Sequence, residues 1–93
     1  MIEQILLKNI LTPKNMYMII NYDTTLNIQH NCKKLNLTYP MVFNNLILFQ
    51  KYGLLINTKQ GRDCYVLFTE KGNKIKNNIF CMIKTLKQCG YND

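Results

Sequence analysis

The side chains of this chain that could do chemistry are mainly cations. The only arginine, Arg62, follows Gly61 between two runs of strand-forming residues, with Lys59 and Gln60 just before it. A structural hairpin could carry any polar pair at its tip, whereas a hairpin that probes an anionic partner would carry a cation there. The alternative is a solvated turn in which Arg62 pairs with Asp63, a contact that contributes at most about 1 kcal/mol.

The overall charge also favours an anionic partner. Twelve Lys and Arg oppose five Asp and Glu, which gives a net charge of +7 and a pI near 9.4. A surplus of this size suits nucleic acid, or else a membrane surface. A basic surface that is only solvated remains the alternative.

The cysteines and the single histidine do not form a metal motif. Cys32, Cys64, Cys81 and Cys89 include no CxxC pair, and only His30 is available beside them, so we expect neither a zinc site nor another cofactor. Cys81 and Cys89 fall about 12 Å apart along one predicted helix and cannot bond to each other. The cysteines are expected to be buried hydrophobes, or Cys81 or Cys89 pairs with another segment or subunit.

An enzyme is the least supported class. Five acidic residues, one histidine and no glycine-rich phosphate loop leave little from which to assemble a catalytic site. His30 is expected to have a surface or capping role, and Cys64 has Asp63 beside it but no identifiable base.

Length and composition indicate one small domain covering residues 1–93. Apolar residues make up 47% of the chain, no run is long enough to span a membrane, and Glu3, Gln4 and Lys8 do not fit a signal peptide. We therefore expect a soluble cytoplasmic protein. Asn, Ile, Lys, Tyr and Phe supply 45 of 93 residues; their A/T-rich codons suggest an A/T-rich genome such as many viruses and plasmids have.

Hydrophobic spacing predicts five helices and one hairpin. The expected order is helices at 2–11, 13–22, 28–35 and 39–52, strands at 54–58 and 64–68, and a last helix from 69 to about 88. Thr12, Thr38 and Thr69 stand where N-caps are expected, and Gly53 stands where a helix C-terminal glycine is expected.

This order, with these residues, resembles the winged helix-turn-helix family of DNA-binding regulators. "IQHNCKKLNLTYPMVFNNLILFQKYGLL" looks like the supporting helix, turn and recognition helix, and "INTKQGRDCYVLFTEKGNKI" looks like the wing and its exit. The exit phrase Thr-Glu-Lys-Gly is common in MarR-like and PadR-like regulators and in small regulators of archaeal plasmids and viruses. The resemblance covers residues 13–75. It implies a mainly α fold with a small β-hairpin: an N-terminal helix (1–11), helix-turn-helix and wing (13–68), and a C-terminal helix (69–89).

The resemblance also implies sites on duplex DNA. A helix at about 39–52 would lie in the major groove, and a wing at 59–63 would reach the minor groove, where a narrow A/T-rich groove favours Arg, or the phosphates. The positions carried over are the groove-facing Tyr39, Pro40, Met41 and Asn44, with Asn45 nearby; the wing residues Lys59, Gln60 and Arg62; and the phosphate-contacting Lys33, Lys34 and Lys51.

The recognition helix departs from the family pattern, because it has no basic residue before Lys51 and adds Phe43, Ile47 and Leu48 outside its core stripe. Asn can bind adenine bidentately and Met or Tyr can pack against a thymine methyl, so an A/T-rich site is feasible. Two functions stay open: a transcription regulator, or a protein-interaction module that docks a partner on this apolar helix.

The terminal helices bear on assembly. The apolar stripes at 2–11 and 75–86 exceed what a small core can cover. In related regulators such helices build a two-fold dimer that matches a palindromic site, so we expect a homodimer, linked through Cys81 or Cys89 if either lies near the axis. Packing of both helices onto their own domain is the alternative.

Overall fold

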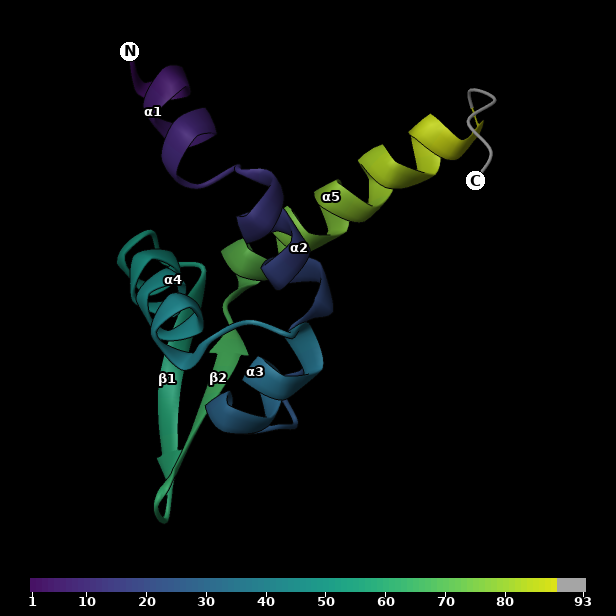
Figure 1. The fold of residues 1–93 in the computed structure, drawn as a ribbon. Helices are drawn as coiled ribbons and strands as arrows, with labels where there is room; N and C mark the ends of the chain where they lie inside the picture. Colours follow the sequence, from purple (N-terminus) through teal and green to yellow (C-terminus); the bar gives the residue numbers. More distant parts are fainter. Residues whose placement is uncertain (89–93) are drawn as a thin grey trace.

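The computed structural model describes residues 1–88 and shows a group of helices from which one long hairpin projects (Figure 1). The elements, in chain order, are α1 (Ile2–Asn9), α2 (Pro13–Asn21), α3 (Ile28–Leu35), α4 (Tyr39–Lys51), β1 (Leu55–Gln60), β2 (Asp63–Phe68) and α5 (Glu70–Gln88). The expected order of helices and strands is confirmed. Cys89 and Gly90 lie outside the described residues.

The hairpin is longer than its sequence predicts. We expected a five-residue connection, but β1 and β2 pair antiparallel from Leu55↔Phe68 to Gln60↔Asp63, which leaves only Gly61 and Arg62 in the turn. Gly61 has a φ of +63°, which suits the first central position of a two-residue hairpin turn. The polar residues at 59, 60 and 63 lack strand propensity, yet the turn geometry extends the pairing through them and carries Arg62 to the tip.

The core lies where α2, α3, α4 and the base of the hairpin meet. Its most deeply buried large side chains are Met18, Ile19, Val42, Phe49, Leu55 and Val66. Val42, Leu46 and Phe49 are the three residues of α4 that are buried, as its i, i+4, i+7 spacing predicts. This packing fixes which side of α4 faces outward.

A buried asparagine shapes the loop between α2 and α3. Asn31 is fully buried; its Oδ1 accepts from the Asp23 N–H (2.8 Å), and its Nδ2 donates to the carbonyls of Asp23 (2.8 Å), Leu26 (3.2 Å) and Asn27 (3.0 Å). With these bonds the buried amide has its donor and acceptor groups paired, as buried polar groups usually do. Asn31 therefore anchors the loop that precedes α3.

The end of α4 is joined closely to the start of α5. Gly53, with φ +76°, ends α4, and its carbonyl accepts from the Thr69 hydroxyl at 2.6 Å. The same hydroxyl accepts from the Gly72 N–H at 3.1 Å, so Thr69 caps α5 as expected. Lys71 Nζ donates to the Tyr52 carbonyl at 2.8 Å. One cluster of bonds thus holds the C-terminus of α4 against the N-terminus of α5.

Of the other two expected N-caps, Thr12 makes its capping bond and Thr38 does not. Thr12 accepts from the Asn15 N–H at 3.2 Å, and Pro13 occupies the first turn of α2. Thr38 is the N-cap residue of α4 but its side chain makes no capping bond. Pro40 in that first turn has no N–H to donate, so fewer amides there need a partner.

Two helices leave the body of the molecule. α1 buries none of its residues, and much of α5 extends away on the other side (Figure 1). The radius of gyration is 14.1 Å, against about 12 Å for a compact chain of this length. No helix within residues 1–88 has both the length and the apolar character needed to cross a bilayer.

Candidate nucleic-acid interface

A tight turn sets α4 across α3. Asn36 adopts a left-handed conformation (φ 57°), and the Leu37 N–H donates to the Cys32 carbonyl at 3.1 Å. Asparagine tolerates this conformation better than most residues. α3, the turn and α4 therefore form the helix-turn-helix unit, and α3 packs against α4 and β2.

The outward side of α4 is uncharged until its last turn. Residues opposite the buried stripe are Pro40, Asn44, Ile47 and Lys51, at i, i+4, i+7 and i+11. All four are exposed. Ile47 was expected only in an apolar patch for a protein partner, but the helical period also puts it on this outward stripe.

The other expected groove-facing residues lie on the flanks of α4. Tyr39 is 45% exposed and stacks on Phe43, with ring centroids 5.8 Å apart and planes at 14°. Met41 is half-buried. Asn45 is half-buried as well, and its Nδ2 donates to Met18 Sδ at 3.2 Å, toward α2. Among the expected set, Pro40 and Asn44 are the side chains on the outward stripe.

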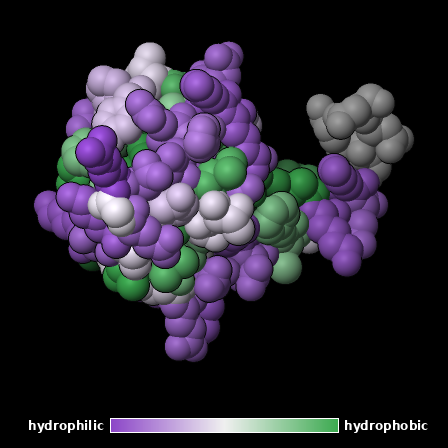
Figure 2. Space-filling view, turned by 90° about the horizontal axis from the view of Figure 1, so that it is seen from below, coloured by the Kyte–Doolittle hydropathy of each residue, from purple (hydrophilic) through white to green (hydrophobic). Residues whose placement is uncertain are grey.

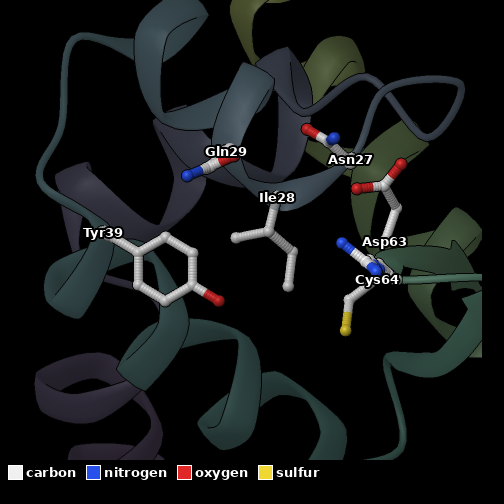
Figure 3. A pocket seen from close by; sticks show the side chains of 7 residues that line it. Asn27, Ile28, Gln29, Tyr39, Asp63 and Cys64 are labelled. Atoms are coloured by element: carbon white, nitrogen blue, oxygen red, sulfur yellow. The ribbon is translucent and has the colours of Figure 1, made fainter.

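A hollow separates the start of α4 from the wing tip. It has a volume of about 270 Å³ and is lined by Asn27, Ile28, Gln29, Tyr39, Arg62, Asp63 and Cys64. Tyr39 and Cys64 point into it from opposite sides, with Ile28 between them (Figure 3). Lys59 is the cross-strand partner of Cys64, and direct partners project from the same face of a hairpin. The wing cations and the start of α4 therefore flank one opening.

The remaining expected contact residues are exposed. Lys33 and Lys34 lie in the last turn of α3, Lys51 ends α4, and Lys59 and Gln60 end β1. A bond not foreseen from sequence ties the wing to α4: Asn57 Nδ2 donates to Gln50 Oε1 at 3.0 Å. This bond links the base of the wing to the last turn of α4.

Seen from the wing side, the surface is mostly hydrophilic with separate small hydrophobic areas (Figure 2). A further hydrophobic area lies where α5 leaves the body (Figure 2). The exposed surface of α4 and the wing thus mixes cations with apolar side chains such as Phe43 and Ile47, and α5 exposes the apolar side chains of Met82 and Leu86.

The titratable groups behind the interface are structural. Burial raises the pKa of the Tyr22 phenol above its usual range, nearby Cys32 adds to this, and the Asn31 amide partly offsets it. The Tyr22 hydroxyl is buried without a well-formed hydrogen bond among residues 1–88. Burial also raises the pKa of the Cys32 thiol, whereas hydrogen bonds from Thr25 lower the pKa of the exposed Asp23 carboxyl.

The cysteines are distributed between core and surface. Cys32 is buried, as expected for a small hydrophobe, but Cys64 and Cys81 are exposed thiols, contrary to that expectation. Cys89, the other candidate for a disulfide, lies outside the described residues. Across residues 1–88, His, Cys, Asp and Glu side chains nowhere gather in threes as a metal site would require.

A helix-turn-helix followed by a hairpin that flanks the second helix defines the winged helix-turn-helix fold. Solved structures of MarR-family regulators share it. MepR, a regulator of the Staphylococcus aureus multidrug efflux pump MepA, superposes with a TM-score of 0.76 at 18% identity, over 94% of this chain and 67% of MepR. A MepR mutant bound to an oligodeoxyribonucleotide superposes with a TM-score of 0.71 at 19% identity, over 92% and 67%. A MarR-family transcriptional regulator from Rhodococcus sp. RHA1 superposes with a TM-score of 0.75 at 13% identity, over 97% and 69%.

These likenesses concern the fold, and the chain spans about two thirds of the length of these regulators. No protein-family model and no curated protein sequence matches the chain.

Proposed function

We propose that the protein is a transcription regulator that binds double-stranded DNA as a homodimer, without catalysis. The observation that carries the proposal is that Tyr39, at the start of α4, and Arg62, at the wing tip, line one hollow, while the outward stripe of α4 and the wing cations are exposed. Such a regulator would act in the cytoplasm, or in the host cytoplasm if the chain is viral. The MepR mutant that binds an oligodeoxyribonucleotide shares this fold, which supports the proposal.

The geometry supports contacts to two neighbouring grooves. α4 would enter the major groove with Pro40, Met41 and Asn44 toward the base edges. The two-residue turn puts Arg62 at the far end of a hairpin whose two strands have six residues each, where a guanidinium suits the minor groove or a phosphate. The hollow between them would receive the sugar-phosphate strand that separates the grooves, with Tyr39 beside it. The half-buried Asn45 would act mainly by fixing α4 on α2.

The proposal is tested by fluorescence anisotropy with a pool of random duplexes at 50 to 400 mM salt. Lys33, Lys34, Lys51, Lys59 and Arg62 are the five exposed cations assigned to the DNA contacts, so the logarithm of the binding constant is expected to fall with the logarithm of salt concentration with a slope of roughly −4 to −5 per bound copy. No binding to any duplex at the lowest salt would overturn the proposal. In that case the protein-interaction module would be the better function.

The homodimer is proposed from the apolar surface on α1, α2 and α5. A groove of about 340 Å³ runs between α2 and α5, lined by Pro13, Met16, Tyr17, Ile20, Ile79, Met82, Ile83 and Leu86. Met82 and Leu86 are more than half exposed, as are Ile2 and Leu7 on α1. Since the chain's net charge of +7 opposes self-association, a large apolar area is the means by which two copies would join. Two α4 helices related by a two-fold axis would then match a palindromic site.

A charge placed in this groove is expected to separate the copies. Met82→Asp buries a carboxylate in an apolar contact, so the variant should elute as a monomer where the unmodified protein elutes as a dimer. Size-exclusion chromatography with light scattering measures the mass. Asn77→Asp adds the same charge to an exposed position on the opposite side of α5 and should leave the dimer intact. A monomeric parent protein at micromolar concentration would refute the dimer.

A further inference from the structure

We propose that Ile47 and Asn44 together determine base specificity: Asn44 binds an adenine edge, and Ile47 contacts the C5 methyl of a thymine one or two steps away. This deepens the proposed function and depends on it. Its consequence is that the protein recognises thymine methyl groups, so that DNA with uracil in place of thymine is a poorer ligand.

The spacing of the two residues suits neighbouring base pairs. They stand at i and i+3 on the outward stripe of α4, and both are exposed, Ile47 to 49%. Side chains three apart on a helix have Cβ atoms about 5–6 Å apart, and successive bases along a strand rise about 3.4 Å. The pair therefore spans one to two base steps.

The chemistry of the stripe selects A·T pairs. The thymine methyl is the one apolar group on the major-groove edges of the bases, and adenine offers the N7 acceptor and N6 donor that an amide matches. Ile47 placed against any other edge would desolvate a polar group without replacing its hydrogen bond, which is unfavourable. The stripe offers no cation before Lys51 to bind guanine O6 and N7.

The apolar residues around Ile47 are already engaged, which argues against a protein partner. Leu48 packs on the core, and Phe43 stacks on Tyr39. The exposed apolar surface on this side is thus divided among a few part-covered side chains. Lys51 on the stripe, Lys33 and Lys34 on α3 and Lys59 on the wing are exposed cations, which suits a polyanion.

The test begins with duplexes selected from a random pool by the unmodified protein. Each selected duplex is then made again with deoxyuridine for thymidine, which removes the methyl and keeps the base pairing. The unmodified protein is expected to bind the uracil duplex about fourfold more weakly for each methyl contacted, the change that burial of one such carbon group produces. Ile47→Ala should bind both duplexes equally. Replacing adenine by 7-deazaadenine should weaken the unmodified protein and leave Asn44→Ala unaffected.

Ile56→Ala is the matched control. Ile56 lies on the wing and is 50% exposed, against 49% for Ile47. The Ile56→Ala variant therefore loses the same side chain at a similar exposure, and it should keep the full preference for thymine. Equal binding of thymine and uracil duplexes by the unmodified protein would overturn the inference and leave the proposed function standing. So would selection of G·C-rich duplexes. Absence of any duplex binding would overturn both.

Discussion

Replacement of Gly72 by alanine is expected to lower the free energy of unfolding by about 3 kcal/mol or more, the upper range for overpacked sites. A Cβ on Gly72 would stand 1.9 Å from the Leu54 carbonyl oxygen and 2.9 Å from its carbon. That carbonyl is backbone and accepts from the Thr69 N–H at 3.0 Å. It cannot move aside without breaking the cluster of bonds that joins α4 to α5. Urea unfolding followed by circular dichroism at 222 nm measures the loss.

Two substitutions separate this clash from other effects. Asn73→Ala changes the adjacent exposed residue of the same helix and should leave the unfolding midpoint almost unchanged. Gly53→Ala meets no atom within 4 Å but must adopt φ +76°, which costs roughly 1–2 kcal/mol. Gly72→Ala should therefore be the most destabilising of the three. A midpoint equal to that of the parent protein would show that α5 does not approach Leu54 this closely.

The double substitution Lys59→Ala, Arg62→Ala is expected to weaken duplex binding by about 10- to 100-fold at 100 mM salt. Both side chains stand at or beside the wing tip and are exposed, so their loss should not affect folding. Removal of two phosphate or minor-groove contacts should also reduce the steepness of the salt dependence by roughly two. Anisotropy titrations across salt concentrations measure both quantities.

The matched control is a second double variant that has the same net charge as the first. Lys84→Ala, Lys87→Ala removes two exposed cations from the end of α5, so both double variants carry +5 instead of +7. If the wing makes specific contacts, only the first variant loses affinity. Equal loss in both would mean that charge alone attracts DNA, and that the wing has no particular role.

The fold was largely predictable because its signals are local. Thr12-Pro13, Gly53 and Thr69 are caps whose chemistry acts within a few residues, and the apolar period of α4 fixed its buried side. Interactions across the chain were not predictable. Asn31 has no local signal for its four hydrogen bonds to the preceding loop, and the close approach of Gly72 to Leu54 depends on how α5 packs.

The candidate site was predictable in its elements but not in each side chain. Asn44 turns outward as the helical period predicts, but nothing in the sequence near Asn45 indicates that its amide donates to Met18 on α2. The wing cations were assigned to the tip, but the length of the hairpin depends on pairing through Lys59 and Gln60, which propensity does not indicate. The exposure of Cys64 follows from that pairing as well.

The bonded junction between α4 and α5 has a mechanical consequence. Because Thr69, Lys71 and Gly72 hold the start of α5 against the end of α4, we expect the two helices to move as one rigid unit. The 19 residues of α5 span about 28 Å. A rotation of about 10° about the far end of α5 would therefore displace α4 by roughly 5 Å, more than one base step. In a two-fold assembly, any change that rotates the two α5 helices would alter the distance between the two α4 helices. The half-site spacing that the assembly fits would change with it.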